Sequence, residues 1–262
     1  MRRSLADPEF GTAAMTEGFR LGASMELDLR VRADGGFVVM HDDTLDRETD
    51  GSGPVDVRTA DELAGVRYRQ SRCPLILSEH LARLTPSAHP SALLQFDMKD
   101  DLARIGARGL DHLTDLFGSS TNPIIFSGAC LDLIGALGDR LAHLPRGIDP
   151  TDRLVEIAQA RGQAATEAAL VGELRGGTSP DTCYLSWRLV LNAQRHGLDL
   201  VALCHSEGVK VDAWTYTLAT PSRGFSEAEW AEFRAIMDLG PDQITTDEAV
   251  ATEAAWVAHG AQ

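Results

Sequence analysis

The sequence predicts an α/β fold in which parallel strands alternate with helices, and three observations support this class. Short apolar runs alternate along the chain with segments of helical periodicity, which favours a parallel sheet with right-handed crossovers. Some runs, such as residues 123–126, are continuously apolar, as in strands that are buried on both faces. The length of 262 residues suits one α/β barrel, which typically needs about 250. We therefore expect residues 1–262 to form a single domain.

The first recognisable strand is predicted at residues 25–30, where apolar and polar side chains alternate. This period of two places Glu26 and Asp28 on the same face of the strand. Their Cα atoms are then roughly 6–7 Å apart, so both carboxylates can bind one hard cation. A turn at residues 33–36 leads to a second apolar run, which ends at His41. A histidine therefore follows the carboxylate pair across a short reversal of the chain.

The second strand of this kind, at residues 92–98, repeats the pattern at its carboxyl end. Gln95, Asp97 and Lys99 share one face there. The other strands are predicted at residues 123–126, 141–146, 183–186, 210–215 and 243–245. Helices are predicted at residues 16–21, 77–84, 102–116, 131–137, 153–160 and 189–196. Capping-box spacing, Thr59 with Glu62 and Ser226 with Glu229, predicts that two further helices begin at Thr59 and near Ser226.

Composition limits the partners and the location of the protein. The chain has 24 Lys and Arg residues against 39 Asp and Glu residues, and its net charge of −15 argues against nucleic acid as a partner. Its four cysteines are too widely spaced to form a metal-binding motif, which indicates buried thiols in a reducing compartment. No segment resembles a secretory signal or reaches the roughly 20 apolar residues of a transmembrane helix. We expect a cytoplasmic protein without a stable membrane anchor, and no oligomeric state is predicted.

The segment from residue 25 to residue 53 resembles the glycerophosphodiester phosphodiesterase family. That family has a Glu-Leu-Asp strand, a turn with Asp-Gly, an apolar run ending in His-Asp, and a Leu-x-Arg-x-Thr-x-Gly-x-Gly segment. The corresponding elements here are Glu26-Leu27-Asp28, Asp34-Gly35, His41-Asp42 and Leu45-Asp46-Arg47-Glu48-Thr49-Asp50-Gly51-Ser52-Gly53. Near the carboxyl end, Trp214-Thr215 and the segment from Gly240 to Asp247 also resemble the family. Several motifs in a fixed order are more specific than any one of them.

The resemblance implies a (β/α)8 TIM barrel with a small insertion between its second and third strands, at approximately residues 54–90. It also implies metal-dependent hydrolysis of a glycerophosphodiester, a small-molecule substrate, to an alcohol and sn-glycerol 3-phosphate. The implied ligands of the divalent cation, Mg²⁺ or Ca²⁺, are Glu26, Asp28 and Asp97. The family has Glu at the third position, so the Asp97 carboxylate reaches about 1.5 Å less far, and a bridging water could restore the contact.

The resemblance assigns further roles to a histidine, a lysine and one of two arginines. His41 is implied as a catalytic proton-transfer group. Lys99 is implied at the phosphate, as a catalytic and substrate-binding residue, where Arg2 or Arg3 completes the phosphate site. Trp214, at the end of a predicted strand, either packs in the core or forms a wall of the substrate pocket.

The beginning of the chain departs from the family pattern. The family has a first strand that ends in His-Arg-Gly, followed by Pro-Glu. Counting back from Pro8-Glu9 places Arg2 or Arg3 at the family's arginine, and the family's histidine at Met1 or before it. We therefore expect a barrel without its first strand and with severely impaired hydrolysis. A late start and a decayed copy both explain this pattern. Alternative functions are a catalytically inactive barrel that binds a ligand, and a phosphodiesterase for lysophospholipids or other phosphodiesters.

Overall fold

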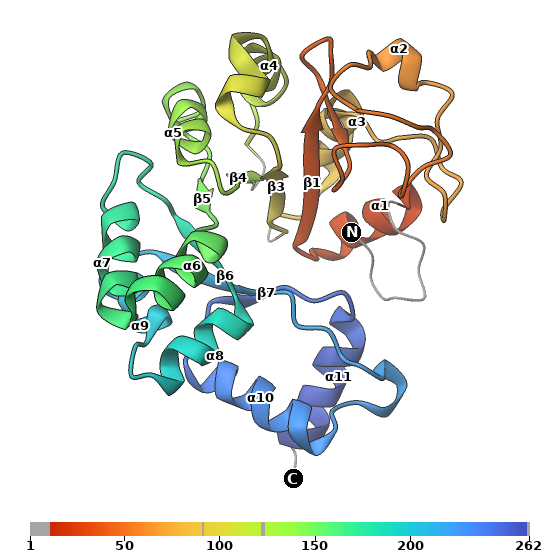
Figure 1. The fold of residues 1–262 in the computed structure, drawn as a ribbon. Coiled ribbons are helices and arrows are strands. Elements are labelled where there is room, and N and C mark those ends of the chain that lie inside the picture. Colours follow the sequence, from red (N-terminus) through yellow and green to blue (C-terminus); the bar gives the residue numbers. More distant parts are fainter. Residues whose placement is uncertain (1–10, 91, 122–123, 261–262) are drawn as a thin grey trace. The chain divides into compact units, whose positions relative to one another are not determined.

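The structure of the chain is a computed structural model that describes residues 11–90, 92–121 and 124–260. Contacts divide the chain into two units, of which the first extends to Arg146 and the second begins at Gly147. Each unit contains one four-stranded sheet with helices packed on it (Figure 1). This arrangement confirms the predicted α/β class with parallel strands. The assignment of residues 1–262 to one domain stays a prediction.

The sheet of the first unit has the strand order β2-β1-β3-β4. Its members are β1 (Met25–Val31), β2 (Phe37–Val39), β3 (Leu94–Met98) and β4 (Ile124–Ser127). β1, β3 and β4 are parallel, whereas β2 returns from a turn and pairs antiparallel with β1. The register places Asp28 opposite Asp97, and Asp97 opposite Ser127. Three polar side chains therefore form one row across the carboxyl ends of these strands.

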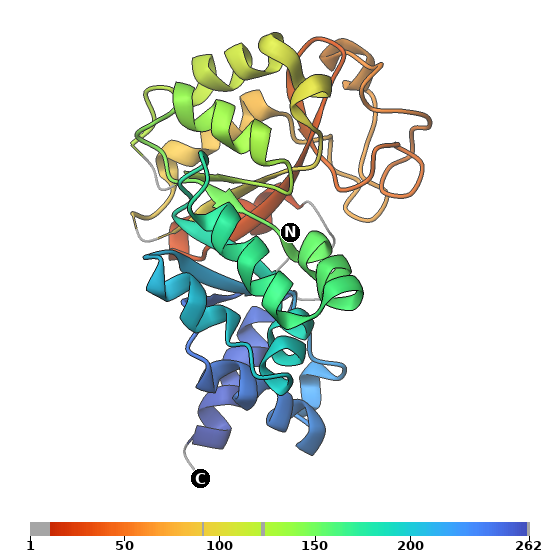
Figure 2. The same cartoon turned by 60° about the vertical axis from the view of Figure 1, so that its left-hand side comes forward.

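The helices of the first unit are α1 (Thr12–Leu21), α2 (Ala60–Leu63), α3 (Ser78–Leu84), the 3₁₀ helix η1 (Thr85–Ser87), α4 (Leu102–Phe117) and α5 (Leu131–Arg140). Three of them, α3, α4 and α5, pack on its sheet. α4 and α5 lie side by side (Figure 2). Phe117 from α4 packs on Phe96 and Phe126 of the sheet, with ring centroids 5.3 and 6.0 Å away. The predicted insertion at 54–90 contains α2, whose capping box is confirmed, and α3, which precedes β3.

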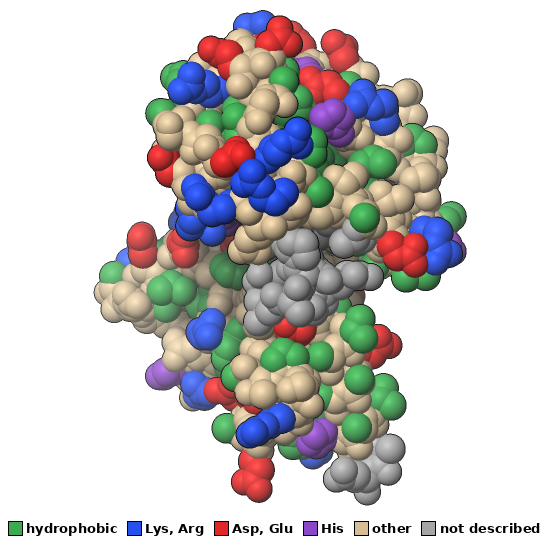
Figure 3. All heavy atoms as spheres, turned by 90° about the vertical axis from the view of Figure 1, so that its right-hand side faces the viewer, with side chains coloured by type: hydrophobic (Ala, Val, Ile, Leu, Met, Phe, Trp, Pro, Cys, Tyr) green, Lys and Arg blue, Asp and Glu red, His purple; other side chains and the backbone are tan. Residues whose placement is uncertain are grey.

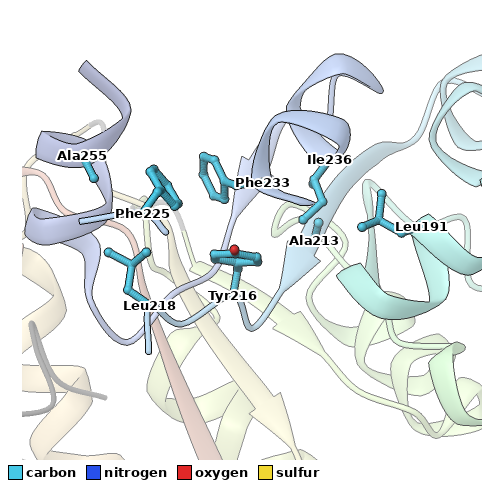
Figure 4. Close-up of a cluster of buried hydrophobic side chains, with 8 residues drawn as sticks. All are labelled: Leu191, Ala213, Tyr216, Leu218, Phe225, Phe233, Ile236 and Ala255. Atoms are coloured by element: carbon cyan, nitrogen blue, oxygen red, sulfur yellow. The ribbon is translucent and has the colours of Figure 1, made fainter. Parts of the chain in front are cut away.

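The second unit has four parallel strands in the order β5-β6-β7-β8. These strands are β5 (Gly147–Ile148), β6 (Thr182–Ser186), β7 (Lys210–Trp214) and β8 (Gln243–Ile244). Its helices are α6 (Thr151–Arg161), α7 (Gln163–Leu174), α8 (Trp187–Arg195), α9 (Leu200–Ser206), η2 (Pro221–Arg223), α10 (Glu227–Asp238) and α11 (Ala249–Gly260). Figure 4 shows a buried cluster in which Tyr216, Phe225 and Phe233 meet. The predicted capping box of Ser226 and Glu229 begins α10.

The prediction of a strand at residues 141–146 is wrong. α5 extends to Arg140, and the Leu141 backbone N–H still donates to the Leu137 carbonyl oxygen at 2.8 Å. Leu141 and Leu144 are buried in a turn after this helix, not in a strand. The strand itself is β5, and of the predicted residues Arg146 alone makes a parallel bridge, to Phe126. Apolar residues that are buried under a turn were thus taken for a β-strand.

The predicted helices include none at α7, α9 or α11. The segments of α7 and α11 are rich in alanine, so apolar residues occur around most of each helix and no clear stripe marks a buried face. Within the described residues, no helix has the length and apolar character needed to cross a membrane. Figure 3 shows one face of the molecule, on which acidic, basic and hydrophobic side chains all occur.

A fully buried carboxylate, Asp212, lies on β7 in the second unit. Its Oδ2 atom accepts hydrogen bonds from Gln243 Nε2 at 2.5 Å and from Thr245 Oγ1 at 2.9 Å. Its Oδ1 atom is buried and has no hydrogen-bond partner among the described residues. Burial raises the pKa of Asp212 from 3.8 to about 6, although both of these donors oppose the rise.

Because the raised pKa belongs to the folded state, Asp212 favours folding when it is protonated. Its contribution is complete below about pH 4 and is lost as the pH rises through about 6. Unfolding followed by denaturant titration should therefore show up to about 3 kcal/mol of stability lost over this range. Asp212→Asn should remove that part of the pH dependence. The exposed Asp238→Asn is the matched control and should leave it unchanged. Equal pH profiles for the wild-type protein and Asp212→Asn would contradict the assignment.

Candidate active site

Glu26 and Asp28 lie on one face of β1, as the alternation predicts. Leu27 and Leu29 point to the opposite face and are fully buried in the core. The apolar side chains thus fix the orientation of the strand, and the carboxylates must face the other way. Asp97 joins them on the same face, because β3 runs parallel to β1 in register.

Ligand oxygens of these three carboxylates all lie within 4.8 Å of one another. Oxygens bound to one Mg²⁺ or Ca²⁺ ion are at most about 4–5 Å apart, so the spacing fits either ion. Although Asp97 is shorter than the family's glutamate, its carboxylate reaches this group. The donor set contains only hard oxygen atoms, the kind that these ions prefer.

The Lys99 ammonium group lies between two of the three carboxylates. Its Nζ atom is 2.8 Å from Asp28 Oδ1 and also contacts Asp97 Oδ2. Burial alone would lower the pKa of Lys99, but the two carboxylates raise it well above its ordinary value. A positive charge is therefore already favoured between Asp28 and Asp97, which supports the fit of this site to a cation.

The pKa values of Glu26 and Asp28 are shifted in opposite directions. Burial, together with the charges of Asp28 and Asp97, raises the pKa of Glu26 well above its usual range. Burial also opposes ionisation of Asp28, but Lys99, the hydrogen bond from Glu26 and His41 together lower the pKa of Asp28. Burial and the acidic neighbours thus favour the neutral form of Glu26, whereas cation binding would favour its ionised form.

His41 follows β2, on the side of the hairpin away from its turn, and the preceding residue, Met40, is hydrogen-bonded to the Asp28 carbonyl oxygen. Its Nδ1 atom is 2.9 Å from Asp42 Oδ1. Arg47 donates two hydrogen bonds to Asp42, of 2.5 and 2.7 Å, and above all this contact lowers the pKa of Asp42. Because ionised Asp42 can only accept, Nδ1 of His41 carries the hydrogen, and Nε2 is left for proton transfer.

A buried glutamate holds the same loop in place. Glu48 Oε2 accepts the backbone N–H of His41 at 3.2 Å, and Oε1 accepts that of Asp42 at 3.1 Å. Arg47 donates to Glu48 as well, at 2.7 Å. His41, Asp42 and Glu48 form a second group that could hold a metal ion by distance. We do not assign it one, because Arg47 already pairs with both carboxylates.

Arg30 connects the histidine loop to the end of β3. Its Nε atom donates to the His41 carbonyl oxygen, and its Nη1 atom donates to the Lys99 carbonyl oxygen, both at 2.9 Å. The same guanidinium pairs with buried Asp100 at 3.1 Å. Arg30 thus fixes His41 and Lys99 at one edge of the sheet. In the sequence, Arg30 lies on the same face of β1 as Glu26 and Asp28. This position was a signal that Arg30 contributes to the site, but no role was predicted from it.

The structure brings together most of the residues that the sequence indicates. Glu26, Asp28, Asp97 and Lys99 are in one group, and His41 interacts electrostatically with Asp28. Trp214 ends β7 in the second unit, and its buried Nε1 atom has no hydrogen-bond partner among the residues described. Arg2, Arg3 and Pro8-Glu9, together with the position expected for the first strand's histidine, fall outside the described residues.

The carboxyl ends of the parallel strands β1 and β3 carry acidic and basic groups, and His41 follows β2, the antiparallel partner of β1. Functional groups gathered at strand ends are typical of the active sites of α/β-barrel enzymes. Residues 7–251 match the model of the "Glycerophosphoryl diester phosphodiesterase family". The chain therefore belongs to this family, whose members are phosphoric diester hydrolases. The resemblance seen in the sequence is thereby confirmed.

One curated relative is the "Glycerophosphodiester phosphodiesterase" of Caldanaerobacter subterraneus subsp. tengcongensis. It is 41% identical over 66 residues, and this match covers 23% of the present chain and 27% of the relative. The matched stretch thus spans about a quarter of the relative's length. It supports the family and leaves the activity of the whole chain to be proposed.

Solved structures confirm the predicted barrel fold. A glycerophosphodiester phosphodiesterase from Parabacteroides distasonis has a TM-score of 0.69 at 14% identity and covers 100% of this chain and 94% of its own. An Oleispira antarctica phosphodiesterase, solved with its product sn-glycerol-3-phosphate, has a TM-score of 0.68 at 16% identity, covering 97% and 94%. A protein from Agrobacterium tumefaciens has a TM-score of 0.65 at 19% identity, covering 94% and 92%.

Proposed function

We propose that this chain hydrolyses glycerophosphodiesters, with a divalent cation, to an alcohol and sn-glycerol 3-phosphate. The observation that carries the proposal is the group of three carboxylates and a lysine at the strand ends of a chain from this family. The product bound in the Oleispira antarctica phosphodiesterase supports the same class of substrate. A phosphate diester carries a negative charge, which the acidic edge would repel in the absence of a cation.

In this proposal Glu26, Asp28 and Asp97 bind Mg²⁺ or Ca²⁺. The bound cation supplies positive charge to a phosphate oxygen. Lys99 supplies a second positive charge at the same edge, and it keeps that charge because its pKa is raised. Trp214 and one of the two N-terminal arginines, Arg2 or Arg3, are proposed as further substrate-binding residues.

His41 is the proposed proton-transfer residue, acting through Nε2. Hydrolysis requires one proton to leave the attacking water and one to reach the leaving alkoxide. In the family pattern a second histidine shares this work, and the 262 residues place no histidine at the matching position. We therefore propose that these 262 residues, assayed alone, turn over about 10²–10⁴-fold more slowly than a version extended by a strand ending in His-Arg.

The test is hydrolysis of glycerophosphocholine by the chain and by its extended version, with Mg²⁺, with Ca²⁺ and with a chelator. We expect the extended version to be faster and the chelator to abolish its activity. Activity that survives the chelator would contradict the cation requirement, and equal rates would contradict the impairment. Folded protein that binds glycerophosphocholine without cleaving it would favour the ligand-binding alternative. Cleavage of lysophospholipids alone would favour the other substrate class.

A further inference from the structure

Asp97 is held by a buried hydrogen-bonded chain that begins at Gln95 on its own strand, β3, and passes through Ser127 on the neighbouring strand, β4. Ser127 Oγ donates to Asp97 Oδ1 at 3.1 Å, and Gln95 Nε2 donates to Ser127 Oγ at 3.0 Å. Ser127 is fully buried and Gln95 is 7% exposed. Since these atoms are shielded from water, losing one partner leaves a polar group without compensation.

The direction of this chain follows from the chemistry of its three groups. The Gln95 amide can only donate through Nε2, so the Ser127 oxygen is its acceptor. The Ser127 hydroxyl group can then donate its hydrogen to the Asp97 carboxylate. Lys99 contacts the other carboxylate oxygen, Oδ2. Both oxygens of Asp97 therefore have a fixed donor, and the carboxylate has a single favoured orientation.

The arrangement matters because Asp97 stands where the family pattern has a longer glutamate. A glutamate has one more methylene and can reach a cation through several rotamers. The shorter aspartate must lie in one position, with its free lone pairs toward Glu26 and Asp28. The strand register supplies that position, because Ser127 lies directly opposite Asp97 on β4. Neighbouring strands are about 4.8 Å apart, a distance that a serine hydroxyl can bridge to a carboxylate.

We propose that Ser127 and Gln95 are positioning residues that hold the short Asp97 carboxylate toward the cation. This inference rests on the proposed function, because it requires that Asp97 binds a divalent cation. Groups that orient a metal ligand typically change metal affinity about 10–100-fold when they are removed. Cation affinity should depend on Ser127 only while residue 97 is an aspartate. This dependence should disappear when a glutamate replaces Asp97.

The experiment measures the dissociation constants of Ca²⁺ and Mg²⁺ by calorimetry on the full chain. Four proteins form a double-mutant cycle: the wild type, Ser127→Ala, Asp97→Glu and the double variant. Ser127→Ala should weaken cation binding by about 10–100-fold when Asp97 is present. In the Asp97→Glu background, the same change should alter binding by less than about threefold, the range of independent sites.

Two controls separate positioning from folding. Ser127→Thr keeps the hydroxyl and should retain most of the affinity. Ser186→Ala makes the matched change at the carboxyl end of β6, where no side-chain cap bond is made, and should leave affinity unchanged. If Ser127→Ala does not fold, Gln95→Met serves instead. It keeps the Ser127 hydroxyl but frees it to rotate, so it should bind more weakly than the wild type.

Each outcome decides the inference. Equal affinity of the wild type and Ser127→Ala, or an equal loss in both backgrounds, overturns it and leaves the proposed function standing. Equal affinity of the wild type and Gln95→Met overturns it in the same way. A wild-type chain that binds neither ion overturns both the cation requirement and this inference.

Discussion

Replacing Asp28 with asparagine is expected to abolish cation binding and to lower hydrolysis by at least about 100-fold. Burial opposes ionisation of Asp28, but Lys99 above all lowers its pKa, which favours the negatively charged form that binds a cation. A bound cation contributes several kcal/mol to a reaction in which charge develops, and each 1.36 kcal/mol is worth tenfold in rate. The measurement is calorimetry with Ca²⁺ and Mg²⁺, combined with the rate of glycerophosphocholine hydrolysis by the extended version.

The matched control for Asp28→Asn is Asp115→Asn, the same change at an exposed position on α4. It should leave both cation affinity and rate unchanged. Asp28→Asn also removes one of the two partners of Lys99, so thermal unfolding of both variants must show that they are folded. A folded Asp28→Asn protein with wild-type cation affinity would contradict the proposed metal site.

The alternation of β1 shows what the sequence could establish about this site. Glu26 and Asp28 share a face because the strand has a period of two, and no tertiary contact is needed to infer this. Asp97 and Lys99 were found in the same way at the end of β3. Strand order and the family pattern then placed both strand ends at one edge. These inferences used local periodicity and motif order, which the sequence displays directly.

The side chains that hold the site in place depend on register between distant strands. Ser127 meets Asp97 only because β4 pairs with β3 at that residue, and Arg30 reaches the Lys99 carbonyl oxygen across 69 positions. In the sequence, Glu48 is only one residue of a motif. Its burial under the His41 loop depends on the tertiary structure and could not be predicted from the motif. The strand predicted at residues 141–146 was wrong for a related reason. The apolar side chains of this segment are buried under a turn, and their burial does not require an extended strand.

Replacing His41 with alanine is expected to lower kcat by about 10²–10⁴-fold in the extended version and to change KM little. The reason is that His41 transfers a proton in the proposed reaction and supplies no cation ligand. Cation affinity should therefore stay within about threefold of the wild type, in contrast to Asp28→Asn. The matched control is His143→Ala at an exposed position after α5, which should leave kcat unchanged.

The same substitution in the 262 residues alone tests whether two histidines act together. Groups that act as a unit are strongly non-additive, so His41→Ala should cost much less where the partner is already absent. A full 10²–10⁴-fold loss in both versions would mean that His41 works independently of any upstream histidine. The proposed impairment of the 262 residues would then need a cause other than the lack of a second histidine. An unchanged kcat in the extended version would instead remove His41 from the proposed reaction, although Asp42 and Arg47 orient its ring.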